Sequence, residues 1–164
     1  MGHIWLIGMM GSGKTSVGKK VADRLGVPFI DADAEVVTAT GRSIENLFSE
    51  SEAAFRRAER VAIARIATLE DRVVATGGGV VLDAANVVAM KSTGTTVLLD
   101  ADARTLSARL SDTDDRPLLN GGRDIATIAA DRASAYAASA DVVVDTSDRD
   151  IDEVVEAVAR CVSM

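Results

Sequence analysis

The stretch Gly8-Met9-Met10-Gly11-Ser12-Gly13-Lys14-Thr15 decides the fold of this chain. It matches the pattern G-x-x-x-x-G-K-[ST] at every fixed position, and it stands between an apolar run at 3–7 and a helical pattern at 14–25. A strand before the loop and a helix after it are the setting that a phosphate-binding loop requires. Its glycines let backbone N–H groups point at phosphate oxygens, and the helix N-terminus adds positive potential. We therefore expect a nucleoside triphosphate to bind here.

Two side chains of the loop add chemistry that the backbone cannot supply. Lys14 offers a point charge to the β and γ phosphates, and Thr15 offers a hydroxyl to Mg²⁺. A plain glycine turn and a dinucleotide-binding loop are the alternatives. The second alternative explains a G-x-G start and the acid at Asp31, but Ser16 occupies the place of its third glycine. The loop therefore favours ATP with Mg²⁺ over a dinucleotide.

Outward from the loop, short apolar runs alternate with longer helical patterns. Most of the runs are continuous, as in strands that are covered on both faces. Helices between them imply parallel crossovers, so the sequence predicts an α/β fold with a doubly wound parallel sheet. The expected strands are 3–7, 28–30, 72–75, 95–99 and 142–144, and the expected helices are 14–25, 34–40, 44–48, 52–69, 84–91, 103–110, 124–138 and 151–162.

The composition of the chain limits its number of domains, its partners and the metal sites that it can form. The chain has 164 residues, of which 48% are hydrophobic, and this length suits a single domain over 1–164. A net charge of −7 argues against nonspecific binding to nucleic acid or to an anionic membrane. Cys161 is the only cysteine and His3 the only histidine, which excludes an intrachain disulfide and a Cys/His zinc site. We expect a cytoplasmic monomer without a signal peptide or membrane span, in which Cys161 is partly buried.

Two carboxylates follow the second expected strand. Asp31 and Asp33 are two positions apart, so their side chains share a face if the chain stays extended. Like charges this close are costly unless a cation or another partner offsets them. One carboxylate could face Mg²⁺ and the other an acceptor hydroxyl. Alternatively, they cap the next helix, because Asp is a favoured N-cap residue.

Arginine supplies most of the positive charge, and its planar fork grips carboxylates and phosphates in a bidentate manner. Arg56 and Glu59 are three positions apart in an expected helix and share a face, where a solvated ion pair is the usual outcome. Arg132 precedes Tyr136 by one helical turn, a spacing that a surface pair also explains.

Two glycine-containing stretches stand out. Gly77-Gly78-Gly79 follows the third expected strand, and three glycines suggest that something approaches the backbone closely. Arg116 lies in a polar stretch at 111–123 that also contains Gly121-Gly122. That stretch is interpreted as a lid, with an ordinary exposed loop as the alternative.

Together these features resemble shikimate kinase, a family of small P-loop kinases of the nucleoside monophosphate kinase type. The resemblance implies a five-stranded parallel sheet in the order 2-3-1-4-5, a substrate-binding segment at about 33–60 and a mobile lid at about 111–123. It also implies transfer of the γ-phosphoryl group of ATP to the 3-hydroxyl of shikimate, with Mg²⁺ as cofactor. The motifs that carry it are the loop 8–15, Asp31-Ala32-Asp33, Gly41-Arg42-Ser43-Ile44, Phe55-Arg56-Arg57-Ala58-Glu59, Gly77-Gly78-Gly79, Arg116-Pro117-Leu118-Leu119, Arg132 with Tyr136, and Val144-Asp145-Thr146.

The resemblance also implies roles for single residues. Lys14, Asp33 and Arg116 would be catalytic, with Asp33 helping to remove the hydroxyl proton and Arg116 neutralising charge on the transferring group. The substrate-binding set would be Asp33, Arg56, Glu59, Gly77, Gly78, Gly79 and Arg132, in which the two arginines clamp the carboxylate and Glu59 holds Arg56. The ATP-binding set would be Gly11, Ser12, Gly13, Lys14, Thr15, Ser16, Arg109, Arg116 and Arg149, with Arg109 stacked on adenine. The Mg²⁺ ligands would be Thr15 and Asp31, directly or through a water molecule.

Some positions depart from the family pattern. Ser51-Glu52 replaces the usual Gly-Glu, and Ser134-Ala135 replaces the common Pro-Leu, but neither change removes a catalytic group. Two other functions stay open at this stage. One is a related small-molecule kinase such as a gluconate kinase, because paired arginines indicate a carboxylate substrate but do not determine which ring it carries. The other is a module that binds nucleotide without turnover.

Overall fold

The computed structural model describes residues 1–111 and 123–163, and five parallel strands form one sheet in it. The strand order is β2-β3-β1-β4-β5, so the predicted α/β class and strand order are confirmed. The central strand β1 pairs with both β3 and β4 and is buried along its whole length. The strands are β1 (His3–Ile7), β2 (Phe29–Asp31), β3 (Val73–Ala75), β4 (Gly94–Asp100) and β5 (Val142–Asp145).

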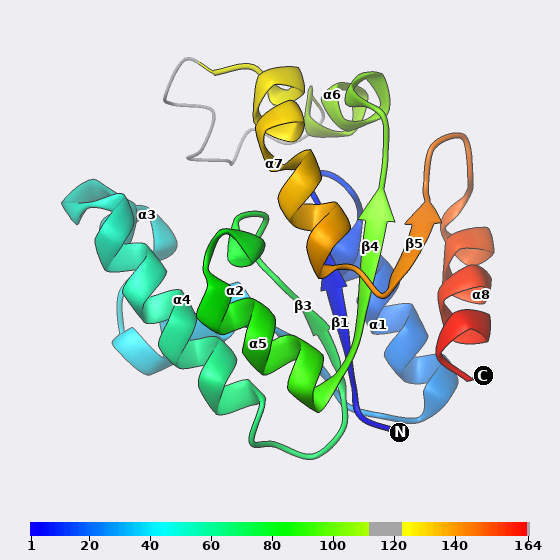
Figure 1. The fold of residues 1–164 in the computed structure, drawn as a ribbon, viewed down its shortest axis with the longest axis horizontal. Helices are drawn as coiled ribbons and strands as arrows, with labels where there is room; N and C mark the ends of the chain where they lie inside the picture. The colour runs from blue at the N-terminus through cyan, green and yellow to red at the C-terminus, as the bar shows by residue number, and fades with distance from the viewer. Residues whose placement is uncertain (112–122, 164) are drawn as a thin grey trace.

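Helices cover both faces of the sheet (Figure 1). On one face α1 (Lys14–Leu25) packs against α8 (Ile151–Val162), and on the other lie α4 (Glu52–Ile66), α5 (Ala84–Thr93) and α7 (Ile125–Ser139). The other helices are α2 (Ala32–Thr40), α3 (Ile44–Glu50), the short 3-10 helix η1 (Val80–Leu82) and α6 (Ala103–Ser111). Within the part of the chain that the structure describes, no helix has the length and apolar composition that a membrane crossing requires.

The side chains of β1 explain why its sequence is apolar from Ile4 to Ile7. Ile4 and Leu6 belong to the apolar layer shared with α1 and α8, whereas Trp5 and Ile7 belong to the layer shared with α4, α5 and α7. Alternate residues of a strand point to opposite faces, so a strand covered on both faces has apolar residues at successive positions. A third, smaller apolar cluster joins α2, α3 and α4 away from the sheet, and it consists of Val36, Leu47, Phe55 and Ala62 with their neighbours.

The chain differs from the predicted elements in a few places. Helix α2 begins at Ala32 rather than Ala34, because the Asp31 side chain accepts hydrogen bonds from the backbone N–H groups of Asp33 and Ala34. Asp31 itself is extended as the last residue of β2, but the helix starts at Ala32, so the chain does not stay extended to Asp33. Cys161 is exposed rather than partly buried, since α8 packs through other positions. The predicted lid, except for its ends at Ser111 and Arg123, lies outside the described residues.

Candidate active site

A cavity of about 480 Å³ lies at the carboxyl ends of β1, β2 and β3. The phosphate loop forms one side of it, and the start of α2, the helices α3 and α4 and the glycine run form the other. Open parallel sheets bind their ligands at this edge. The predicted site residues that it brings together are Gly11, Gly13, Lys14, Thr15, Ser16, Asp31, Asp33, Arg56, Glu59, Gly77, Gly78 and Gly79.

Glycines in the left-handed region shape the phosphate loop. Gly11 has φ 82° and Gly13 has φ 93°, values that side chains with a Cβ rarely adopt. Gly13 stands directly before α1, whose first backbone N–H groups have no partner within the helix. Lys14 Nζ donates hydrogen bonds to the carbonyl oxygens of Gly8 at 2.7 Å and Met9 at 2.8 Å. A phosphate placed here would therefore meet both an ammonium group and a helix N-terminus.

Asp31 connects the phosphate loop to the start of α2. Its Oδ2 accepts a hydrogen bond from Thr15 Oγ1 at 3.0 Å, and its Oδ1 caps α2. The N-cap interpretation of Asp31 is therefore confirmed, and the second carboxylate oxygen faces the loop hydroxyl. Hydroxyl and carboxylate oxygens are ligands that Mg²⁺ accepts, so this pair fits the cation.

The glycine run lies directly against charged side chains. A Cβ at Gly77 would stand 2.9 Å from Glu59 Oε1 and 3.1 Å from Asp33 Oδ1. A Cβ at Gly79 would stand 2.6 Å from Cζ of Arg56. The separations of 2.9 and 2.6 Å are shorter than real Cβ atoms show and that of 3.1 Å is tight, so the missing side chains leave the space in which these charged groups sit.

The middle glycine borders a buried pair on α7. Arg132 and Tyr136 are both buried, with 8% and 4% of their surfaces exposed, so the surface pair considered from sequence is wrong. The hydroxyl of Tyr136 donates a hydrogen bond to the carbonyl oxygen of Gly78, and a Cβ at Gly78 would stand 3.3 Å from Arg132 Nη1. Arg132 does not line the cavity, but its Nη1 lies next to Gly78, which does.

Arg56 and Glu59 form a buried ion pair rather than a solvated one. Arg56 Nη1 lies 2.8 Å from Glu59 Oε2, and only 16% of the arginine side chain and 1% of the glutamate side chain are exposed. Burial raises the pKa of Glu59, Arg56 acts in the opposite direction, and the nearby charge of Asp33 raises it further.

Several buried donor atoms of the two arginines have no hydrogen-bond partner among the residues described. They are Nε and Nη2 of Arg56 and Nη1 of Arg132. Buried polar groups without partners are rare in folded proteins, since each costs about 1–3 kcal/mol. Donors of this kind on two cationic side chains near one cavity suit a bound carboxylate.

An apolar wall completes the cavity, and its role could not be read from the sequence. Ile44, Phe48 and Phe55 line the cavity, and the rings of Phe48 and Phe55 stack at 4.4 Å between centroids. In the sequence these residues look like core positions of one short and one longer helix. Only the packing of α3 against α4 brings them to the site.

A second cavity, of about 240 Å³, lies on the other side of the phosphate loop and brings Arg109 and Arg149 together with Ser12 and Ser16. Arg109 donates hydrogen bonds to the carbonyl oxygen of Gly11 and to both oxygens of Thr146. The predicted adenine-binding arginines therefore adjoin the loop that would hold the phosphates.

Comparison with known proteins agrees with this geometry. The family model described as shikimate kinase matches residues 10–163. This chain belongs to the shikimate kinase family. The shikimate kinase of Symbiobacterium thermophilum is 43% identical over 160 residues, covering 93% of this chain and 91% of the relative. That of Caldanaerobacter subterraneus subsp. tengcongensis is 40% identical over 164 residues, covering 98% and 95%.

A solved structure extends the likeness to three dimensions. The shikimate kinase from Acinetobacter baumannii in complex with shikimate has a TM-score of 0.93 and 29% identity, over 99% of this chain and 93% of that one. Of the site residues expected from the resemblance to shikimate kinase, all but Arg116 lie at the two cavities or, for Arg132, next to Gly78. Arg116 lies outside the described residues.

Proposed function

We propose that this chain transfers the γ-phosphoryl group of ATP to the 3-hydroxyl of shikimate, giving shikimate 3-phosphate and ADP, a step in the biosynthesis of aromatic amino acids. The observation that carries the proposal is that one cavity is lined by both the phosphate loop and Arg56, with Arg132 next to Gly78 at its edge, and that both arginines have buried donors without a hydrogen-bond partner among the described residues. The loop supplies a site for ATP, and the arginines supply a site for a carboxylate acceptor. Membership of the shikimate kinase family supports the same reaction.

The acceptor would be held at three kinds of contact. The open donors of Arg56 and Arg132 would bind its carboxylate through charge-assisted hydrogen bonds. The stacked rings of Phe48 and Phe55 would pack against the carbon ring. The glycine run would let the ring approach the backbone closely. This combination favours a compact cyclic carboxylate over the open chain of gluconate.

Asp33 would act at the reacting hydroxyl. Its Oδ1 lies beside Gly77, in the same cavity as Lys14. A carboxylate at hydrogen-bond distance from the hydroxyl can accept its proton as the oxygen forms a bond to the γ-phosphorus and ADP leaves. Phosphoryl transfer depends mainly on positioning and charge stabilisation, which Lys14 would supply on the phosphates together with Arg116.

Thr15 and Asp31 would hold Mg²⁺, directly or through water. No cluster of three or more His, Cys, Asp or Glu side chains that could hold a metal ion occurs in residues 1–111 and 123–163. Mg²⁺ commonly needs only one or two protein oxygens because nucleotide phosphates and water complete its shell. Bound there, the cation would neutralise charge on the phosphates.

The proposal places the enzyme in the cytoplasm as a monomer. This chain itself carries both the nucleotide-binding and the acceptor-binding residues that the structure describes, which supports the monomer. The free, exposed thiol of Cys161 fits a reducing compartment.

ADP release from Mg-ATP tests the function, measured with shikimate, with gluconate and with no acceptor. Release that depends on shikimate alone is the expected result. Release that depends on gluconate would show that the chain is a kinase with a substrate other than shikimate. Nucleotide binding without acceptor-dependent release would show a binding module instead.

A further inference from the structure

Arg60 and Asp83 join α4 to the segment that follows the glycine run. Arg60 Nε and Nη2 each lie 2.7 Å from Asp83 Oδ2. Asp83 Oδ1 accepts a hydrogen bond from the backbone N–H of Ala85 at 2.9 Å and so caps α5. Both carboxylate oxygens are therefore engaged, and the side chain is only 12% exposed, so Asp83 offers Arg60 a fixed anchor.

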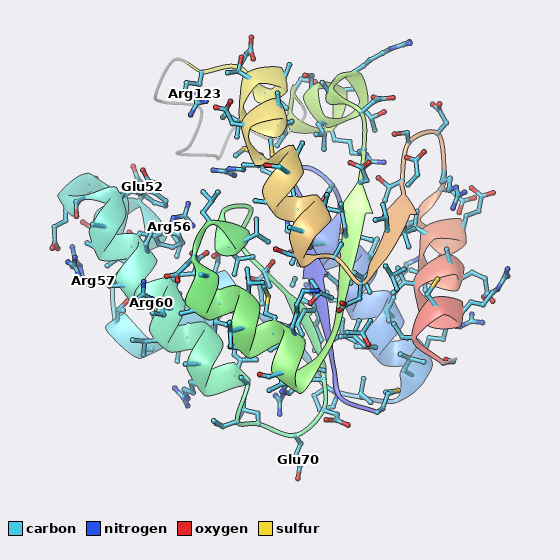
Figure 2. The ribbon with its side chains drawn as sticks, in the orientation of Figure 1. Glu52, Arg56, Arg57, Arg60, Glu70 and Arg123 are labelled. Carbon is cyan, nitrogen blue, oxygen red and sulfur yellow. The ribbon has the colours of Figure 1, made fainter. Side chains whose placement is uncertain are left out.

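The Arg60–Asp83 ion pair lies one helical turn along α4 from the contact between Arg56 and Gly79 at the acceptor site. Arg56 and Arg60 are four positions apart on α4 and lie on neighbouring turns of one face. Gly79 and Asp83 are likewise four positions apart in the facing segment, at the two ends of η1. Figure 2 shows Arg56 and Arg60 along α4, with Arg57 pointing to the outer side. Helix α4 thus meets this segment at Gly79 through Arg56 and at Asp83 through Arg60.

The apolar contacts of α4 do not fix its first half against the sheet. Phe55 belongs to the small cluster that α4 shares with α2 and α3. Ile63 and Ile66, in the second half, belong to the main layer against the sheet. At the level of Arg56, the contacts that hold α4 over the glycine run therefore include polar ones, and the Arg60–Asp83 pair is the ion pair that crosses this boundary next to the site.

We propose that the Arg60–Asp83 ion pair is a positioning device for the acceptor site. It sets the separation of α4 from the segment Gly79–Asp83 and thereby aligns the donors of Arg56 with the carboxylate of the acceptor. Neither residue lines the cavity. The expected effect on the KM for shikimate rests on the proposed function, whereas the contact between α4 and the glycine run does not.

The chain provides a closely matched control on the same helix. Arg65 Nη1 lies 2.8 Å from Glu35 Oε1, with 60% of the arginine and 14% of the glutamate side chain exposed. In the Arg60–Asp83 pair the corresponding values are 59% and 12%. The control pair joins α4 to α2 rather than to the glycine segment, and neither of its residues lines the cavity, so its loss leaves the contact between α4 and the glycine run in place.

The test is a double-mutant cycle on each pair. Arg60→Gln, Asp83→Asn and the double variant are compared with Arg65→Gln, Glu35→Gln and their double variant, and Asn at 83 retains the helix cap. We expect the first set to raise the KM for shikimate about two- to fivefold, the range that one such pair controls, with kcat and the KM for ATP unchanged. The double variant should be no worse than the single ones, because the partners act together. The control set should leave the KM for shikimate unchanged.

Amide hydrogen exchange over residues 53–60 is measured on the same proteins without ligand. Faster exchange there in the Arg60 and Asp83 variants, and not in the control set, supports the contact. Two results would contradict the positioning role in a wild type that turns over shikimate. One is an unchanged KM for shikimate in the Arg60 and Asp83 variants, and the other is an equal rise of this KM in the control set. If the wild type does not use shikimate, the proposed function fails, and amide hydrogen exchange alone then tests the contact between α4 and the glycine run. Unaltered exchange in the Arg60 and Asp83 variants would then overturn the inference.

Discussion

Glu59 holds Arg56 through a buried ion pair of 2.8 Å at the edge of the acceptor cavity. Burial is the largest influence on the pKa of Glu59 and raises it above the ordinary value of 4.5, while Arg56 acts in the opposite direction. The carboxyl is therefore protonated more readily in the folded protein than in the unfolded chain. The buried position of Glu59 beside Arg56 therefore makes the stability of the fold depend on pH.

Glu59→Gln should remove a pH dependence of stability. Because the folded pKa is raised, the contribution of Glu59 to the free energy of unfolding is fully present below its ordinary pKa and is lost as pH rises through the folded value. The difference in Tm, wild type minus variant, should therefore fall as the pH rises above 4.5, measured by thermal unfolding at several pH values. A constant difference would contradict the raised pKa.

Gly79→Ala should displace Arg56 without unfolding the protein. The backbone at Gly79, with φ −99°, accommodates alanine, but its Cβ would overlap the guanidinium group, which can move. We expect the KM for shikimate to rise about tenfold, equivalent to about 1.4 kcal/mol of lost binding, with the KM for ATP unchanged. Gly78→Ala is the milder control, since its Cβ would stand 3.3 Å from Arg132. Equal effects of the two substitutions would argue against displacement of Arg56.

Much of this fold and of the nucleotide site can be predicted from sequence because the signals are local. The glycines of the phosphate loop, its Lys14-Thr15 pair and the continuous apolar strands each specify their own conformation. The acceptor site depends on contacts between distant segments. The spacing of Arg56 and Glu59 indicates a surface pair, and only the packing of α4 beside the glycine run buries it.

Asp31 shows a different limit of sequence reasoning. An N-cap and a ligand near the phosphate loop are separate interpretations of one acidic residue, and the sequence cannot choose between them. Each carboxylate has two oxygens, and here one caps α2 while the other accepts a hydrogen bond from Thr15. The apolar residues Phe48 and Phe55 likewise serve both a small core and a cavity wall.

Asp33→Asn should preserve the fold and abolish most turnover. The amide keeps the size of the carboxylate but cannot accept the proton of the acceptor hydroxyl, and general base catalysis contributes about 10²–10⁴-fold. We expect kcat to fall by about that factor while Mg-ATP still binds, as measured by ADP release and by calorimetric titration of the nucleotide. Near-normal turnover would exclude Asp33 as the base.

Two substitutions at Asp31 should separate its two oxygens. Asp31→Asn keeps an acceptor that can cap α2 and loses the charge beside Thr15, so the Mg²⁺ concentration for half-maximal activity should rise about tenfold with little change in Tm. Asp31→Ala also removes the cap, which costs about 1 kcal/mol, and Tm should fall. Magnesium titrations of activity and thermal unfolding provide the two readouts. A normal magnesium requirement in Asp31→Asn would place the cation elsewhere.

Arg109→Lys should weaken ATP binding and leave the acceptor site intact. The guanidinium group joins the phosphate loop at Gly11 to the end of β5 at Thr146, and one ammonium group cannot reproduce these three hydrogen bonds in a planar fork. We expect the KM for ATP to rise about tenfold and the KM for shikimate to stay the same, in steady-state assays that vary each substrate. Arg104→Ala, an exposed position on the same helix, is the control and should change neither constant. A parallel rise in both constants for Arg109→Lys would mean that the phosphate loop itself is displaced, and that Arg109 supports the whole site rather than the nucleotide half.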